Sequence, residues 1–449
     1  MPRATSKPSA AAPTLTLTLE EARGVALAAQ GLDSLGAADA RPGPATTAED
    51  LAAMIERLGI VQIDTISVVA RSQFLVLWSR LGAYPQRLLD EALYPRRDIF
   101  EYWSHAASIL PMADYPYYRG EMRRSTGGEP TGWHEQWVRE HADVLRETLA
   151  AIRARGPLAS ADFENPTDGR RAEPWGWYGP KESRRALDIL WLRGDLMIHS
   201  RRAGQKVFDL RERVLAEANG KAPASDRKLP SAHQRIDHFV RRTTSALGVL
   251  TPSWLWDYYR LGERDASAHA HATGNGRRAR ALSLLDALAR EGALVPARIK
   301  GLDEPAYLAA ERLPDLEQLR AGAAPTRTTL LSPFDNLIWD RSRARGLFGY
   351  EVCFEAYVVP EKRRYGYYCL AILHRGRLVG RLDPKFERRE RRLIVRALHL
   401  EPGVTPDADL LDGLAGALRE LAAFLGAETV SVERADPAEA APLLAERVA

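Results

Sequence analysis

The spacing of apolar residues predicts two short helices near the N-terminus. Residues 15–21 lead into the first, because Thr18 can cap a helix and a glutamate follows three residues later, as a capping box requires. A similar signal at residues 47–50 begins a helix over residues 51–58. Gly59 ends that helix, as a C-terminal glycine often does.

After this glycine the pattern changes between extended and helical spacing. Residues 60–64 are β-branched, with polar and apolar positions alternating from Val61, which predicts a short extended segment. Helical spacing returns over residues 68–81. Residues 100–110 are expected to form either a wing-like pair of strands or a buried connector, and a long amphipathic helix is predicted over residues 133–155.

The middle of the chain repeats one order of elements, with helices first and a hairpin last. A helix near residues 182–193 precedes a hairpin at residues 196–210, where two β-like runs flank a basic turn that contains glycine. After a polar linker, a strand and turn at residues 293–301 follow three helical segments, at residues 236–247, 254–259 and 279–291. A helix followed by a small hairpin is typical of a winged helix-turn-helix, so two such units are expected here.

From Thr328 onward the pattern consists of short β-like runs separated by basic turns. Strands are predicted at residues 352–359, 365–373, 377–382, 393–400 and 429–433, with a helix near residues 410–425. This part of the chain is therefore expected to be a small β-rich or α+β domain.

Composition narrows the class of protein. A chain of 449 residues with 45% hydrophobic and 27% charged residues is typical of a globular protein with two to four domains. No stretch approaches the roughly 18 apolar residues of a membrane span, and the N-terminus lacks the apolar core of a signal peptide. Cys353 and Cys369 lie in apolar surroundings without CxxC spacing, so we expect buried, reduced side chains in a reducing cytoplasm.

The positions of the basic residues are more informative about a DNA partner than the net charge of +4 is. Residues 361–392 hold eleven Lys and Arg against four Asp and Glu, mainly on turns, which suits contacts to DNA phosphates. A solvated charged face would have the same composition. The candidate DNA contacts are Arg71, Arg80, Arg201, Arg202, Arg277, Arg278, Lys362, Arg363, Arg364, Arg375, Arg377, Arg388 and Arg389.

Gln62 and Asp64 are the candidate catalytic residues. They lie two positions apart on a predicted extended segment, so their side chains are expected to share a face, while Val61 and Ile63 point away. The Gln-x-Asp pattern alone is common, and it equally fits a solvated strand edge beside a helix cap at residues 64–67.

Histidines offer a weaker alternative. His105 lies in an apolar run and is expected to be packed rather than catalytic. His269 and His271 lie among small and polar residues, which favours a linker over a metal site. The sequence contains no Gly-rich phosphate loop, GxSxG elbow or HExxH motif.

Several longer runs together resemble the YcaQ/AlkX branch of the AlkZ-like DNA glycosylases. The matching runs are QIDTISVVARS (62–72), LVLWSRLGAYP (75–85), EYWSHAA (101–107), LSPFD (331–335), IWDR (338–341), KRRYGY (362–367) and LHRGRLVGR (373–381). They occur in the family's order, and the resemblance extends from about residue 15 to about residue 430. The family's Gln-apolar-Asp motif maps onto Gln62, Ile63 and Asp64, whereas a sister branch has Gln in place of Asp64.

The resemblance implies an α+β, mainly α, fold. It implies three tandem winged-helix domains in a C-shaped arrangement with a basic concave DNA-binding surface, followed by a β-rich C-terminal domain. The expected bounds are a disordered tail at residues 1–13, winged-helix domain 1 with the catalytic motif at 14–130, winged-helix domain 2 at 131–220, winged-helix domain 3 at 221–325 and the C-terminal domain at 326–449.

The resemblance also implies the activity. The expected function is a monofunctional DNA glycosylase that removes N-alkylated purines, especially N7-alkylguanine, and unhooks interstrand crosslinks, with Gln62 and Asp64 as the catalytic pair. No metal, nucleotide or redox cofactor is implied. The expected partner is double-stranded DNA, and the protein is expected to be a cytoplasmic monomer at the nucleoid. The alternatives are a non-enzymatic winged-helix DNA-binding protein or regulator, and a metal-dependent hydrolase that uses the three histidines.

Overall fold

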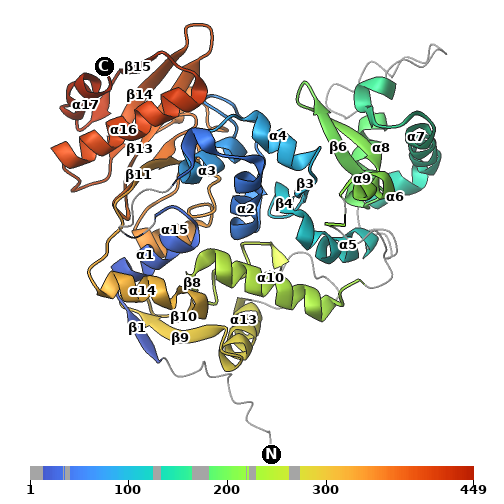
Figure 1. The fold of residues 1–449 in the computed structure, drawn as a ribbon, viewed down its shortest axis with the longest axis horizontal. Coiled ribbons are helices and arrows are strands. Elements are labelled where there is room, and N and C mark those ends of the chain that lie inside the picture. The colour runs from blue at the N-terminus through green and yellow to red at the C-terminus, as the bar shows by residue number, and fades with distance from the viewer. Residues whose placement is uncertain are drawn as a thin grey trace, which may run out of the picture. The chain divides into compact units, whose positions relative to one another are not determined.

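The computed structural model describes residues 14–33, 35, 41–124, 133–163, 182–218, 220–221, 229–261 and 274–449. It divides into two compact units, coloured along the chain in Figure 1. Unit 1 consists of the residues up to Gln86 with Ser104–Ala107 and Ile236–Ala449, and unit 2 consists of Arg87–Trp103 with Ser108–Arg235. Among the described residues we find no helix with the length and apolar character needed to cross a bilayer. The expected disordered tail, His269 and His271 lie outside these residues.

Capping boxes begin the first two helices of unit 1, as predicted. At the start of α1 (Leu19–Ala29), the Thr18 hydroxyl accepts the N–H of Glu21 at 3.0 Å, and the Glu21 carboxylate accepts the N–H of Thr18 at 2.7 Å. The same arrangement at Thr47 begins α2 (Ala48–Leu58). Caps of this kind stabilise a helix by about 1 kcal/mol each.

The residues predicted to lead into α1 do so, and Leu15–Leu17 form the strand β1, which the sequence did not predict. β1 pairs in parallel with β9 (Leu294–Ile299) in a sheet of order β1-β9-β10-β8. The other two strands are β10 (Pro305–Ala309) and β8 (Val249–Leu250). This sheet joins residues of the expected first and third domains, and the two compact units divide the chain differently from the expected domain bounds, which remain predictions.

Between α2 and the next helix the chain is only briefly extended. Gly59 ends α2 with a left-handed φ of 73°, and a Cβ there would lie 2.0 Å from the Tyr259 hydroxyl, so glycine is required. β2 (Val61–Gln62) follows, and α3 (Ser72–Leu81) begins four residues later than the helical spacing predicted. Residues 63–71 therefore form an irregular loop, which we call the Asp64 loop.

Unit 1 has four further described α-helices between residues 232 and 348. They are α10 (Ala232–Leu247), nearly all of which belongs to unit 1, α13 (Gly274–Arg290), α14 (Leu313–Arg320) and α15 (Arg341–Phe348). α10 and α13 confirm two predicted helices, whereas residues 254–259 form turns.

A second sheet of unit 1 forms the C-terminal part of the chain. Its order is β11-β12-β13-β14-β15, with β16 paired to β14, and α16 packs across it (Figure 1). The elements are β11 (Thr328–Leu331), β12 (Leu370–His374), β13 (Arg377–Glu387), β14 (Arg392–Leu400), α16 (Ala408–Leu425), β15 (Thr429–Val432), β16 (Ala435–Asp436) and α17 (Ala440–Val448). The predicted strands from residue 365 onward and the predicted helix are confirmed, with shifted ends.

The predicted strand at residues 352–359 is wrong, because this segment is a loop. The carboxylate of Glu355 accepts the backbone N–H groups of Arg364, Tyr365 and Gly366 at 2.8, 2.8 and 3.2 Å. These bonds fold the segment back onto residues 364–366, so side-chain contacts override its β-branched and aromatic composition.

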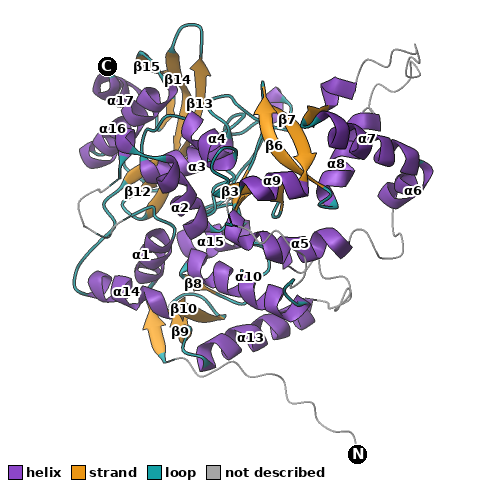
Figure 2. Ribbon diagram, turned by 45° about the vertical axis from the view of Figure 1, so that its right-hand side comes forward, coloured by secondary structure: helices purple, strands orange, loops and turns teal. Residues whose placement is uncertain are grey.

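Unit 2 contains the hairpin that the sequence predicts at residues 196–210. β6 (Leu196–Arg202) and β7 (Gln205–Leu210) pair in antiparallel register. The turn between them is Ala203-Gly204, and both turn residues have positive φ. β5 (Leu158–Ala159) extends the sheet in the order β5-β7-β6, and α8 (Glu182–Leu192) packs on β6 (Figure 2). The predicted order of helix and hairpin is confirmed, while the tandem winged-helix arrangement remains a prediction.

The other described α-helices and β-strands of unit 2 have five to 14 residues each. They are α4 (Arg87–Leu93), β3 (Ile99–Trp103), β4 (Ala107–Pro111), α5 (Tyr115–Arg124), α6 (Trp133–Glu140), α7 (Ala142–Arg155) and α9 (Arg211–Glu217). The wing-like strand pair at residues 100–110 is present as β3 and β4. The single helix predicted over residues 133–155 is instead two helices, because His141 leaves helical geometry with φ −123° and ψ 32°. The mixed α+β class is confirmed.

Candidate catalytic site and DNA contacts

The segment that leads into the candidate site is fixed by buried polar side chains of unit 1. The side-chain amide of Asn336 donates to the carbonyl of Ile60 at 2.8 Å and to the hydroxyl of Tyr258 at 2.8 Å. That hydroxyl donates to the carbonyl of Leu58 at 2.8 Å, and burial raises the pKa of Tyr258 to about 12, so it remains a neutral donor. The N–H of Ile63 donates to the carbonyl of Ala107 at 2.7 Å. The backbone before Asp64 is thus held on both sides.

Asp64 lies in the irregular loop just after β2 and is half-buried. Its Oδ1 accepts the N–H of Ile66 at 2.6 Å, which forms an Asx turn. Its own N–H donates to Oε1 of the buried Gln73 at 3.3 Å. The helix cap considered for residues 64–67 is therefore a turn, and α3 begins only at Ser72. Neither Oδ2 of Asp64 nor the carboxylate as a whole has an ion-pair partner among the described residues.

The Asp64 carboxylate interacts electrostatically with Tyr368, which ends a chain of buried hydroxyl groups. Burial raises the pKa of the Asp64 carboxyl above its usual value, and the hydrogen bond from Ile66 opposes this effect. Ser72, Ser332 and Tyr368 are fully buried and form a chain, with 2.8 Å between the two serine hydroxyls and 2.9 Å from Ser332 to Tyr368. Burial raises the pKa of Tyr368, and the charge of nearby Asp64 raises it further.

Gln62 ends β2 and is half-buried. Its side chain makes no hydrogen bond to the residues that the structure describes, so its amide is available to a ligand or water. Val61, its neighbour on the strand, is fully buried, whereas Ile63 is half-buried like Gln62 and Asp64. Because β2 ends at Gln62, the expected shared face of Gln62 and Asp64 remains a prediction. The catalytic roles assigned to Gln62 and Asp64 remain predictions.

The hairpin of β13 and β14 reaches the Asp64 loop. The guanidinium of Arg388 donates to the carbonyls of Ser67 and Val69 at 2.8 and 3.2 Å, and the N–H of Phe386 donates to the carbonyl of Val68 at 3.0 Å. Arg388 was predicted to bind DNA phosphates. Arg388 is exposed, and its NH2 group binds the loop that carries Asp64, while the DNA contact remains a prediction.

Arg80 is wrong as a DNA contact. Both its side chain and that of Asp335 are fully buried, and they form a bidentate pair with distances of 2.5 and 2.9 Å. Arg80 lies near the end of α3, where almost every residue faces the interior, so its charge points into the protein. The pair joins α3 to the segment after β11.

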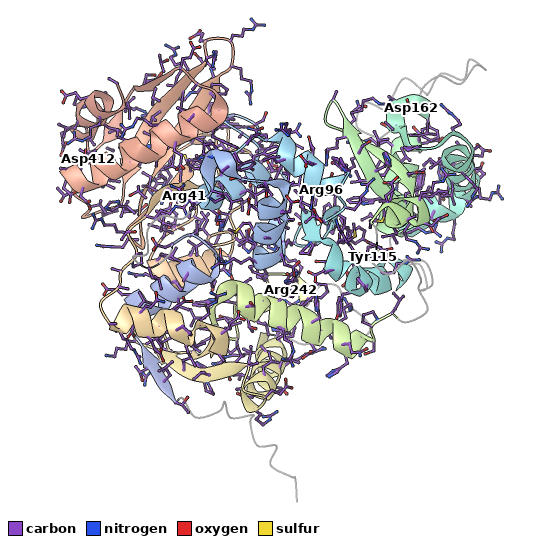
Figure 3. The ribbon with its side chains drawn as sticks, viewed as in Figure 1. Arg41, Arg96, Tyr115, Asp162, Arg242 and Asp412 are labelled. Carbon is purple, nitrogen blue, oxygen red and sulfur yellow. The ribbon has the colours of Figure 1, made fainter. Side chains whose placement is uncertain are left out.

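Two arginines of the unit 2 hairpin have acidic partners. Arg201 is mostly buried and pairs with the buried carboxylate of Glu101, with 2.9 Å between its Nε and Oε1. Because this carboxylate needs the guanidinium, Arg201 is better explained as a structural residue than as a phosphate contact. Arg202 is largely exposed and pairs with Asp162, labelled in Figure 3, at 3.1 Å.

The other predicted DNA contacts lie at the surface and remain predictions. Arg278 pairs with Glu304 at 3.2 Å, and Arg375 donates to Asp409 at 2.5 Å. Arg363 donates to the carbonyl of Val358 at 2.8 Å. The candidate contacts with half-buried or exposed side chains are Arg71, Arg277, Arg278, Lys362, Arg363, Arg364, Arg375, Arg377 and Arg389.

His105 is packed against an aromatic ring, as expected. Its imidazole stacks on Trp339 with 4.4 Å between ring centroids, and its Nδ1 lies 3.0 Å from the carbonyl of Asp257. Burial lowers the pKa of His105, while the Asp257 carboxylate opposes that effect. Within the described ranges, no three His, Cys, Asp or Glu side chains gather in an arrangement that could hold a metal ion.

The sequence analysis missed the residues that support Asp64. Gln73, Ser332, Tyr368 and Asn336 have no recognisable motif of their own, although Ser332 lies within the LSPFD run and Gln73 directly follows the QIDTISVVARS run. Their positions within or beside these runs were the available signal. Gln73 accepts the backbone N–H of Asp64, Tyr368 interacts electrostatically with the Asp64 carboxylate, and Asn336 holds the carbonyl of Ile60 before it.

The unpaired carboxylate of Asp64 and the amide of Gln62 lie two positions apart on a mixed α+β scaffold, and comparison with known proteins identifies the class of the protein. The chain belongs to the AlkZ-like DNA glycosylase family, whose model matches residues 55–424. The solved structure of Streptomyces sahachiroi DNA glycosylase AlkZ has a similar fold, with a TM-score of 0.59 and 16% sequence identity over 94% of this chain and 100% of that chain. The family predicted from the sequence is confirmed, and the chain is thereby an enzyme that binds DNA.

Proposed function

We propose that this glycosylase hydrolyses the N-glycosidic bond of N7-alkylguanine and other N-alkylated purines in duplex DNA. Asp64 stabilises the reacting sugar, and Gln62 orients the attacking water or the damaged base. The proposal rests on one observation, which is that the Asp64 carboxylate has no cationic partner among the described residues. One oxygen of that carboxylate is held in a turn by Ile66.

The chemistry of the substrate explains why one carboxylate suffices. Alkylation at N7 places a positive charge on guanine, which makes the base a good leaving group without a general acid. Departure of the base leaves an oxocarbenium-like sugar, as in glycoside hydrolysis. An unpaired carboxylate stabilises that cation and accepts a proton from the attacking water. The reaction written this way requires no metal, nucleotide or redox cofactor.

The same site is proposed to unhook interstrand crosslinks. A crosslinked guanine is tethered to the opposite strand and cannot be turned fully into a deep pocket. The half-buried positions of Gln62 and Asp64 support an open site that acts on a base still close to the duplex. The exposed arginines are proposed to hold the phosphates of that duplex, and the enzyme is proposed to act as a monomer at the cytoplasmic nucleoid.

An alkali assay tests the function. A duplex with one 7-methylguanine is incubated with the protein and then heated in alkali, which cleaves the strand only where a base has been lost. The proposal predicts cleavage at the lesion after alkali. It also predicts an uncut strand without alkali, because a monofunctional glycosylase leaves the abasic sugar intact. Binding to the duplex without any base loss would favour a non-enzymatic DNA-binding protein instead.

A further inference from the structure

Three consecutive carbonyl groups of the Asp64 loop are bound by one hairpin. Ser67 and Val69 accept hydrogen bonds from Arg388, and Val68 between them accepts one from the N–H of Phe386. The ring of Phe386 also lies 5.7 Å from the guanidinium of Arg388. One side chain and one backbone group thus hold the loop three to five residues after Asp64.

The loop depends on these bonds because it has no regular structure of its own between β2 and α3. Its first part is fixed by the Asx turn of Asp64 and by the bond from the Asp64 N–H to Gln73. Its second part is fixed by the hairpin. Loss of the hairpin bonds would remove the hydrogen bonds that hold the carbonyls of residues 67–69, and the turn that orients Asp64 would lose that support.

The hairpin is rigid enough to act as such a support. Its strands pair from Gly380 opposite Leu400 to Glu387 opposite Arg392. Beyond the last pair, the guanidinium of Arg391 donates to the carbonyl of Gly426 at 3.0 Å and pairs with Glu428, at the far end of α16. The tip therefore has one arginine bound to the Asp64 loop and another bound to the end of a helix.

We propose that Arg388 is a positioning residue for Asp64. By binding the carbonyls of Ser67 and Val69, Arg388 holds the catalytic carboxylate in place. This inference rests on the proposed function of Asp64. It assigns Arg388 a role in the rate of base excision rather than in DNA affinity. A displacement of about 1 Å at a reacting group can lower a rate by about a hundredfold, so loss of these bonds is expected to slow excision by tenfold or more.

The test compares R388M with R388K and R391M. Methionine keeps the aliphatic contact with the Phe386 ring but removes both donors, whereas lysine retains an ammonium group that can donate to the same carbonyls. R391M is the matched control, because it removes the same charge from the same hairpin tip on the side that faces Gly426 and Glu428. Excision of 7-methylguanine is measured in single turnovers with the protein in saturating excess, and DNA affinity is measured by fluorescence anisotropy.

The expected result is a saturated rate at least about tenfold lower for R388M, with affinity within about threefold of wild type. R388K is expected to recover most of the rate, and R391M to keep it. A wild-type saturated rate for R388M, a loss confined to its affinity, or an equal loss in R388K would overturn the inference. Failure of the wild-type protein itself to release the base would instead count against the proposed function. If R388M does not fold, R388A takes its place, because it also removes both donors, and the inference then requires faster hydrogen exchange in residues 64–71 together with the lower saturated rate.

Discussion

The substitution Asp64→Asn isolates the charge on which the proposed mechanism depends. Asparagine has nearly the same shape, and its side-chain oxygen can still accept the N–H of Ile66 that Oδ1 accepts at 2.6 Å. The turn, the bond to Gln73 and the surrounding hydroxyl network are therefore expected to persist. What disappears is the negative charge beside the sugar.

The size of the effect follows from the burial of Asp64. Two unit charges about 4 Å apart attract each other by about 1 kcal/mol in water and by about 4 kcal/mol at an effective dielectric constant of about 20. A half-buried carboxylate lies between these limits. Because about 1.4 kcal/mol corresponds to a factor of ten, the excision rate should fall between about fivefold and about a thousandfold.

Single-turnover release of 7-methylguanine at saturating protein measures this loss, with DNA affinity measured on the same duplex. Thermal unfolding supplies the control for folding. Burial raises the pKa of folded Asp64, so the folded protein holds that proton more tightly than the unfolded chain, and ionisation above the unfolded pKa costs stability. The Asp64→Asn substitution removes that cost at neutral pH, and the melting temperature should be equal or higher. A rate within twofold of wild type, with intact fold and affinity, would refute the electrostatic role.

Three further predictions concern pH, the core and the DNA surface. Burial raises the pKa of Asp64, and only its ionised form stabilises the cation, so the wild-type rate should fall as pH drops through that raised pKa. If the wild-type and D64N rates depend on pH in the same way, this prediction is wrong. Asp335 is fully buried with Arg80, so R80A should lower the free energy of unfolding in urea by about 3–5 kcal/mol, and a loss below about 1 kcal/mol would show that the pair is dispensable. R389A should weaken binding to all DNA sequences alike and reduce the salt dependence by about one phosphate contact; an unchanged slope would remove Arg389 from the contacts.

Features with a local signal were predicted well from the sequence. The capping boxes at Thr18 and Thr47 and the left-handed Gly59 are each determined by neighbouring residues, and the structure confirms all three. The β6–β7 hairpin is equally local, since its turn combines two residues of positive φ. Within such elements, composition and spacing contain most of the information needed.

Features that depend on distant partners were predicted poorly. β1 was not predicted as a strand because its partner β9 lies about 280 residues further along the chain, and no local pattern indicates that pairing. Arg80 was taken for a phosphate contact because an arginine bound to Asp335 in the interior has the same sequence signature as an exposed one. For Arg80 a signal existed, because it interrupts the apolar run of α3, which favours an internal ion pair.

The candidate site shows the same division. Gln62 and Asp64 were found through a motif, whereas the hydroxyl chain beside them joins Ser72 to Ser332 across 260 residues. Such contacts arise only once the two ends of unit 1 have packed together. The sequence therefore indicated the reacting groups, but not the residues that hold them.

The most direct test of the account measures free 7-methylguanine in the supernatant after a methylated duplex is mixed with wild-type protein or with D64N at equal bound fractions. The account predicts that the wild-type protein releases the base far faster than spontaneous depurination, and that D64N loses most of this acceleration. Equal release by the two proteins, or no release above the spontaneous rate, would contradict it.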